Sequence, residues 1–196
     1  MFAIVCVSEN WGIGKDGDLL FHIKDDLKRF RELTLDKSVL MGRKTLESLP
    51  GGKGLPRRHN VVLTSNRDFT AENVEVTHFP VEAVFAVGED GAIIGGGQIY
   101  DMFLPLCDRV YVTKVFASPE ADTFFPNLDE DPHWQVECES EIFEEDGLRW
   151  QYVDYVPHEE EEDEEIAALL NSRPSEEPME FYPMPDLGNF SSFHGF

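Results

Sequence analysis

Short apolar runs recur along the first 115 residues and alternate with segments in which apolar residues return every three or four positions. The runs are rich in β-branched residues and too short for buried helices, which predicts strands. They occupy residues 2–7, 37–42, 60–67, 74–77, 91–94 and 108–115. The segments between them predict helices over 23–34, from about 44, over 81–87 and after 97. This alternation indicates an α/β fold.

Two further runs, 134–143 and 148–156, are joined through Glu144 to Gly147. They predict an antiparallel hairpin that closes the sheet, so the expected sheet is mixed. Residues 8–22 form a glycine-containing loop between the first strand and the first helix. A loop of that length in a compact domain is typical of a functional or mobile segment.

The helix predicted over residues 23–34 carries a carboxylate on its apolar face. At 100° per residue Asp26 falls within the apolar arc, while its neighbour Asp25 points the opposite way. The arc consists of Ile23, Leu27, Phe30, Leu33 and Thr34. A carboxylate on such a face loses hydration, which raises its pKa and makes it a candidate site. The alternative is that acids favour the first turn of a helix through the macrodipole. This alternative suffices for Asp25, and both explanations stay open for Asp26.

The charge is large and unevenly placed. The formal net charge is −23, and residues 157–196 hold 11 acidic residues and one arginine. Because lysine and arginine supply most of the affinity for phosphate backbones, so acidic a surface argues against nucleic acid as a partner. Three widely spaced cysteines and six scattered histidines suggest no disulfide framework and no metal site. Without a basic leader or a membrane-length apolar segment, the chain is expected in the cytoplasm.

Three strands end at segments suited to anions: Arg43-Lys44-Thr45, residues 64–67, and Gly95-Gly96-Gly97. Glycines let a backbone approach a ligand closely, and helix N-termini offer free N–H groups to phosphates. Together these segments suit a ligand with several phosphates, such as a phosphorylated dinucleotide. A G-x-G-x-x-G pattern is absent from the sequence, which excludes the Rossmann interpretation. Arg57 and Arg58 are candidates for clamping a carboxylate, although at least one is expected to be a solvated loop residue.

In this order the motifs resemble those of dihydrofolate reductases, over residues 1 to about 156. The motifs are Ile13-Gly14, Asp26-Leu27 with Phe30 and Thr34, VLMGRKTLESL at 39–49, LP-x-R at 55–58, NVVLTS at 60–65, IGGGQIY at 94–100 and ADTFFP at 121–126. The resemblance implies an α/β fold with a mixed, mainly parallel eight-stranded sheet flanked by helices. It also implies NADPH-dependent reduction of 7,8-dihydrofolate to tetrahydrofolate, with hydride transfer to C6 and protonation at N5.

The resemblance further implies roles at matching positions. Asp26 would hold the pteridine and promote protonation at N5, supported by Thr113, and Arg58 rather than Arg57 would bind the substrate's glutamate carboxylate. The substrate pocket would be lined by Val5, Leu27, Phe30, Leu49 and Ile94. The cofactor would contact Cys6, Ile13, Gly14, Leu19, Gly42, Arg43, Lys44, Thr45, Thr64, Ser65, Arg67, Gly95, Gly96, Gly97, Gln98, Ile99 and Tyr100. Asp122 would help hold the loop around Gly14 to Leu19 closed.

The chain departs from the family pattern beside the proposed site. Leu19-Leu20-Phe21 stands where the family has Leu-Pro-Trp, and Lys24 replaces a helix-starting proline. Phe21, at a catalytic position, lacks the indole N–H that would order water near the substrate. Asp26 and Arg58 remain, so an active enzyme of a divergent bacterial or phage type is expected.

Two alternative functions remain open. One is a reductase of the same fold that acts on a ribosylaminopyrimidine, which Asp26 and Arg58 argue against. The other is a structural or regulatory protein that retains the fold. The catalytic domain, residues 1–156, is expected to be monomeric. Residues 157–196 are expected to form a disordered acidic tail that either improves solubility or, through its aromatic residues, recruits a protein partner.

Overall fold

The computed structural model describes residues 1–158. The expectations about the acidic tail, that it is disordered and recruits a partner, concern residues that lie almost wholly outside this described part. Within residues 1–158, no helix combines the length and the apolar character that crossing a membrane requires.

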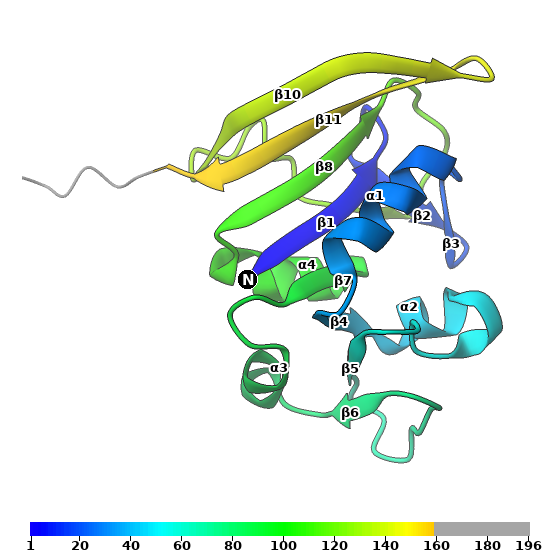
Figure 1. Ribbon diagram of the computed structural model, residues 1–196, viewed down its shortest axis with the longest axis vertical. Helices are drawn as coiled ribbons and strands as arrows, with labels where there is room; N and C mark the ends of the chain where they lie inside the picture. Colours follow the sequence, from blue (N-terminus) through cyan, green and yellow to red (C-terminus); the bar gives the residue numbers. More distant parts are fainter. Residues whose placement is uncertain (159–196) are drawn as a thin grey trace, which may run out of the picture. The chain divides into compact units, whose positions relative to one another are not determined.

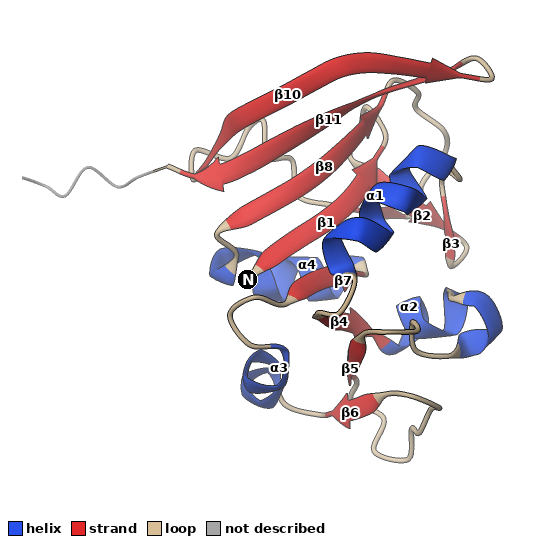
Figure 2. Ribbon diagram, in the orientation of Figure 1, coloured by secondary structure: helices blue, strands red, loops and turns tan. Residues whose placement is uncertain are grey.

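Eight strands form one sheet (Figures 1 and 2). Six neighbouring strands are parallel, and the last two strands of the chain add an antiparallel hairpin at one edge. The spatial order is β10 (Trp134–Glu145), β11 (Leu148–Pro157), β8 (Arg109–Val115), β1 (Phe2–Val7), β7 (Ala92–Gly95), β4 (Ser38–Gly42), β5 (His59–Leu63) and β6 (Glu75–Thr77). The predicted fold class, a mixed and mainly parallel sheet closed by a hairpin, is confirmed. Because β7, β4 and β5 are adjacent and parallel, their carboxyl ends lie next to one another at one edge.

Helices cover both faces of the sheet, as strands with apolar side chains on both sides require. On one face α2 (Arg43–Ser48) buries Leu46 among Val39, Met41 and Val62. On the other face α3 (Pro80–Val87) and α4 (Gly97–Phe103) pack over Leu40, Val61 and Ile93. Two short 3₁₀ turns, Pro50–Gly52 and Leu104–Leu106, complete the connections.

Helix α1 (Lys24–Thr34) lies on the same face as α2 and packs across the middle of the sheet (Figure 1). It begins without a side-chain cap, and the residue before it, Ile23, is buried against Val115 and Trp150. Tertiary packing of one face therefore fixes the helix. On the predicted apolar arc, Ile23 and Thr34 are buried, whereas Leu27 is 47% exposed.

The segment predicted as one long loop, residues 8–22, contains regular structure. Two short strands, β2 (Gly12–Lys15) and β3 (Asp18–Leu19), pair with each other, and β2 also pairs with β9 (Thr123–Phe124) in a small antiparallel sheet. Asp16 and Gly17 form the turn between β2 and β3, both with positive φ. The sequence signal fails here because strands of two to four residues lack a detectable apolar alternation.

Candidate functional site

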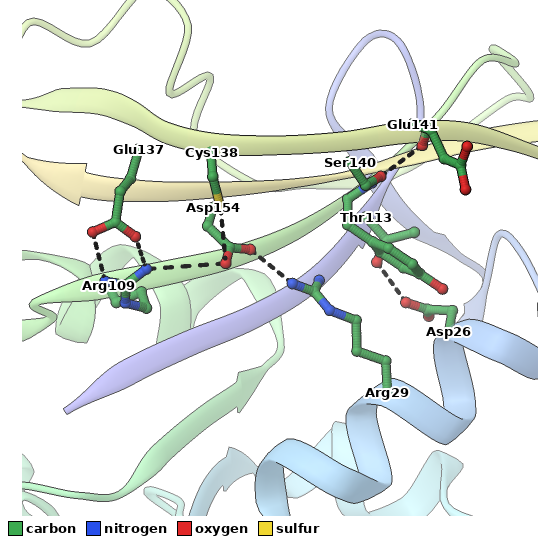
Figure 3. A network of polar contacts seen from close by, with 10 residues as sticks. Asp26, Arg29, Arg109, Thr113, Glu137, Cys138, Ser140, Glu141 and Asp154 are labelled. Carbon is green, nitrogen blue, oxygen red and sulfur yellow. Dashed lines mark hydrogen bonds and ion pairs between the residues drawn. The ribbon is translucent and has the colours of Figure 1, made fainter.

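Asp26 projects from the first turns of α1 towards β8, where Thr113 Oγ1 donates a hydrogen bond of 2.5 Å to Asp26 Oδ1 (Figure 3). Asp25 points away and is exposed. The helical spacing thus gives two consecutive acids two different environments, because successive residues on a helix are 100° apart. Thr113 is buried, and its backbone is paired with Cys6 on β1 and Tyr152 on β11. The strand register therefore determines which side chains surround Asp26.

Burial controls the electrostatics of this carboxyl. Loss of hydration raises the pKa of Asp26 above its ordinary value, and neither the Thr113 hydrogen bond nor the positive charge of Arg29 offsets that rise. Burial also raises the pKa of the neighbouring Cys6 thiol, and the Asp26 charge raises it further. Cys6 is therefore a neutral thiol at neutral pH, and Asp26 is a carboxyl that holds its proton to a higher pH than an exposed aspartate.

The predicted substrate-lining residues come from three elements on the α1 and α2 side. Leu27 and Phe30 belong to α1, Leu49 follows α2, and Ile94 is partly buried near the end of β7. Phe21 is half-buried in the cluster around Ile23 and Trp150. Val5 differs from these residues, because its side chain is buried in the core under α3 and α4. The remaining four predicted lining residues keep partly exposed apolar surface on the face that also carries Asp26.

The two adjacent arginines have different surroundings. Arg57 has a positive φ and pairs with Asp36 through two hydrogen bonds of 3.1 and 2.6 Å. Arg58 instead donates to the Thr34 hydroxyl and to the backbone oxygens of Pro56 and Arg31. Burial and then the Arg31 charge lower the pKa of Arg58 below its usual value. Within residues 1–158 Arg58 forms no ion pair, so its positive charge is held in place without a carboxylate partner.

The glycine segment at the end of β7, Gly95 to Gly97, packs too closely for side chains. A Cβ on Gly95, whose φ is +115°, would lie 3.1 Å from the Tyr100 ring, and one on Gly96 would lie 3.2 Å from Thr45 Oγ1. A Cβ on Gly97 would lie 3.2 Å from Thr123 Cγ2. Tyr100, whose hydroxyl donates to the Ile4 carbonyl at 2.7 Å, is buried beneath this segment. The three glycines therefore allow the chain at the end of β7 to pack closely against Tyr100, Thr45 and Thr123.

The predicted cofactor residues at the ends of β4 and β5 differ in exposure. Lys44, Ser65 and Arg67 have exposed side chains, and the Arg67 guanidinium lies 5.0 Å from the Phe79 ring centroid. Arg43 pairs with Glu47 one turn along α2, at 2.6 and 2.8 Å. Gly42 and Thr45 are partly buried, and Thr64 is buried. In α4, Ile99 is buried and Gln98 is exposed.

Asp122 connects the small sheet to the turn between β2 and β3. Its Oδ2 accepts a hydrogen bond of 2.7 Å from the Asp16 backbone N–H, and its own N–H donates to the Gly14 carbonyl. The first of these bonds is the main cause that lowers the pKa of Asp122. Nearby, Ile13 is buried and Leu19 is 55% exposed.

A group of charged residues that was not predicted from the sequence lies beside Asp26. Arg29 Nη2 donates to Asp154 Oδ1 at 2.7 Å, and Arg109 lies 3.9 Å from the other oxygen of Asp154 while bonding Glu137 (Figure 3). The Arg29 guanidinium also lies 4.4 Å from the Tyr152 ring centroid. The three-residue spacing between Asp26 and Arg29 could have predicted that these two side chains lie close together. Their partners on the strands could not be predicted, since they depend on the register of β11 against β8.

A family model and similar proteins of known function agree on the family to which the chain is similar. The family model described as "Dihydrofolate reductase" matches residues 1–157. A dihydrofolate reductase from Neisseria meningitidis serogroup B is 38% identical over 157 residues, covering 78% of this chain and 95% of that protein. One from Staphylococcus haemolyticus is 37% identical over 145 residues, covering 72% and 86% respectively.

A solved structure gives the same result for the fold. Dihydrofolate reductase from Enterococcus faecalis, complexed with NADP(H) and RAB-propyl, superposes with a TM-score of 0.72 and 33% sequence identity. The match covers 81% of this chain and 96% of that chain. Within residues 1–158, no group of three or more His, Cys, Asp or Glu side chains is arranged to hold a metal ion.

Proposed function

The chain belongs to the dihydrofolate reductase family, and from that premise we propose a role for each side chain around Asp26. The reaction is the NADPH-dependent reduction of 7,8-dihydrofolate to tetrahydrofolate. One observation carries the assignment. Asp26 has a pKa raised by burial, and it lies on the face of the sheet that also carries the partly exposed apolar residues.

Asp26 promotes protonation at N5 of the substrate. Its Oδ1 accepts from Thr113, and within residues 1–158 its other oxygen forms no hydrogen bond, so that oxygen is available for the pteridine's amino group and ring nitrogen. A negative charge held beside the pteridine makes N5 more basic, because the protonated form is then stabilised by Coulomb attraction. Burial strengthens this attraction, since less water screens it. Phe21 supplies no N–H for ordering water, so proton delivery depends on Asp26 more heavily.

The remaining substrate contacts follow from surface character. Leu27, Phe30, Leu49 and Ile94 offer apolar surface for the pteridine and benzoyl groups. Arg58, already oriented by Thr34 and two backbone oxygens, binds the glutamate carboxylate. Arg57 is excluded from this role because Asp36 already occupies its guanidinium.

The residues at the ends of β4, β5 and β7 fit a phosphorylated dinucleotide. When bound, NADPH supplies the hydride that reduces the substrate. Because Gly95, Gly96 and Gly97 carry no side chains, a ligand can approach their backbone closely. Lys44 and Arg67 are exposed cations for phosphate groups, and Arg67 with Ser65 is assigned to the adenosine 2′-phosphate.

Turnover of the purified full-length chain tests this function. NADPH oxidation should require dihydrofolate and yield tetrahydrofolate, while a ribosylaminopyrimidine substrate should give no rate above background. Tight binding of NADPH and dihydrofolate without turnover would instead indicate a protein that keeps the fold for a regulatory purpose. Rapid reduction of the ribosylaminopyrimidine would place the chain's activity with the other reductases of this fold.

We also propose that the acidic tail recruits a protein partner and is dispensable for the chemistry. Its composition supports this, because Phe181, Tyr182, Phe190, Phe193 and Phe196 accompany the acidic run. Strand β11 extends to Pro157, and the His158 N–H donates to the His133 carbonyl, so truncation belongs after His158. The truncated chain should keep its turnover and its NADPH affinity. A marked gain in NADPH affinity would instead indicate an autoinhibitory tail. A large loss of stability would indicate a tail with a structural role.

A further inference from the structure

Arg29 follows Asp26 by one helical turn and projects towards the same strands (Figure 3). Its Nη2 donates to Asp154 at 2.7 Å, and its guanidinium lies 4.4 Å from the Tyr152 ring centroid and 5.3 Å from that of Tyr111. The side chains of Arg29 and Asp154 are only 20% and 15% exposed. An ion pair this sheltered is screened far less than a surface pair, and the two rings restrict where the guanidinium can lie.

The other ionisable groups that act on Asp26 are neutral at neutral pH. Cys6 on β1, Tyr100 on α4 and Tyr152 on β11 each have a pKa raised first by burial and then further by neighbouring charges that include Asp26. Asp25 is exposed, so water screens its charge. Arg29 is therefore the principal charge acting on Asp26 among the described residues.

Asp154 does not cancel the charge of Arg29 completely. Arg109 lies 3.9 Å from the second oxygen of Asp154, so one carboxylate is shared between two guanidinium groups. Arg109 is also bonded to Glu137, and its charge is partly compensated there. The Nη1 atom of Arg29 is buried and has no hydrogen-bond partner within residues 1–158. Part of the positive field of Arg29 thus remains available to Asp26.

We propose that Arg29, held by Asp154 and the Tyr152 ring, is a positioning residue that sets the pH range in which Asp26 drives protonation of the substrate. The inference rests on the role proposed above for Asp26. A nearby cation favours the carboxylate over the protonated acid. Without that cation, Asp26 keeps its proton to higher pH and N5 becomes more basic. Asp26 and N5 titrate as a coupled pair. A higher pKa of either group therefore moves the alkaline limb of the rate profile to higher pH.

Two substitutions should move that limb in opposite directions. Arg29→Gln keeps the stem over Tyr152 but removes the charge, so on the alkaline limb it should retain about threefold more of its maximal hydride-transfer rate than the parent. Asp154→Asn frees the Arg29 charge and should shift the limb to lower pH. Arg29→Lys should restore most of the parental profile. A merely structural role for the ion pair predicts that both neutral variants lose rate in the same direction at every pH.

A second readout keeps this inference separate from the proposed role of Asp26. Carbon-13 NMR of carboxyl-labelled aspartates in the ligand-free enzyme reports the Asp26 titration directly, with the signal assigned by its loss in Asp26→Asn. The midpoint should rise in Arg29→Gln and fall in Asp154→Asn. An unchanged midpoint in both variants would overturn the inference about Arg29. Parental activity in Asp26→Asn would overturn only the catalytic assignment, because the NMR midpoints do not depend on turnover.

Discussion

The side chains around Asp26 are held by one another, whereas the cations at the ends of β4 and β5 extend into solvent. Thr113 bonds Asp26, and Thr34 bonds Arg58, through side chains whose positions follow from helix and strand packing. Lys44 and Arg67, by contrast, are exposed and form no ion pair within residues 1–158. The protein thus fixes the groups proposed for chemistry before a ligand arrives and leaves those proposed for phosphate binding adjustable.

This difference predicts how each region responds to mutation. A preorganised group beside the reacting atoms, such as Asp26, acts on the transition state, so its loss lowers the rate. A preorganised group that holds a distant part of the substrate, such as Arg58, acts on binding, so its loss raises KM. The charge of an exposed cation is screened by water and salt beyond about 8 Å, so it acts on the phosphate it contacts and not on the reacting atoms. Its loss should therefore weaken binding and leave the rate nearly unchanged. Local arginines are nevertheless expected to outweigh the net charge of −23, because charges more than about 8 Å from the ligand are largely screened.

The largest effect is expected at Asp26. Asp26→Asn keeps the shape and the bond from Thr113 but removes the charge that makes N5 basic. Single-turnover hydride transfer at neutral pH should fall by at least about a hundredfold, within the range of general acid–base effects. Asp25→Asn is the matched control and should stay within about twofold of the parent. Similar losses in both variants would mean that the position of the charge on α1 does not matter.

The next largest effect is expected at Arg58. Arg58→Leu removes a charge-assisted pair worth about 2 kcal/mol, so KM for dihydrofolate should rise about thirtyfold with little change in kcat. Arg57→Leu should change KM far less, because Asp36 already binds that guanidinium. Dihydropteroate, which lacks the glutamate, should be reduced with the same KM by the parent and by Arg58→Leu. An equal rise in KM for both substrates would show that Arg58 acts only through the structure of its loop.

A smaller effect is expected at Arg67. Arg67→Ala should weaken NADPH binding about tenfold, or 1.4 kcal/mol, and leave NADH binding nearly unchanged. The free energy of unfolding should change by less than about 0.5 kcal/mol, as for other exposed substitutions. Titrations of the two cofactors by protein fluorescence give the comparison. If both cofactors bind more weakly by the same factor, Arg67 does not recognise the 2′-phosphate.

The smallest effect concerns stability. Burial raises the pKa of Asp26, so the folded protein binds this proton more tightly than the unfolded chain does. Stability from this group is full below the unfolded pKa of about 4 and is lost as pH rises through the folded value. Asp26→Asn should therefore be slightly more stable than the parent at neutral pH, and the gap should close in acid. Thermal unfolding at several pH values measures this, and a less stable variant at neutral pH would contradict it.

The sequence predicted the sheet correctly because its parallel strands are short, apolar and bounded by glycine or polar turns. The runs at 2–7, 37–42 and 108–115 correspond to β1, β4 and β8. The small sheet of β2, β3 and β9 escaped prediction, since strands of two to four residues depend on pairing between distant segments rather than on local pattern. The exposure of Leu27 could not be predicted for a related reason: periodicity defines the apolar face of a helix but not what covers each residue on it.

For the candidate site, the sequence identified the residue types but not their partners. The contrast between Asp25 and Asp26 follows from helix phase alone. Arg57, but not Arg58, pairs with Asp36, and this pairing depends on a loop conformation with positive φ at Arg57. The approach of Asp154 and Tyr152 to Arg29 depends on the register of β11 against β8. Such register is determined by tertiary packing, which no local window of sequence contains.

The pH dependence of the Asp26→Asn deficit tests the central claim most directly. Single-turnover hydride transfer should be measured for the parent and for Asp26→Asn from neutral pH into acid. If Asp26 acts by promoting protonation at N5, the deficit should shrink as the pH falls, because solution protons then reach N5 without the carboxylate. A deficit of constant size at every pH would contradict the account, because it would show that Asp26 only holds the substrate in place.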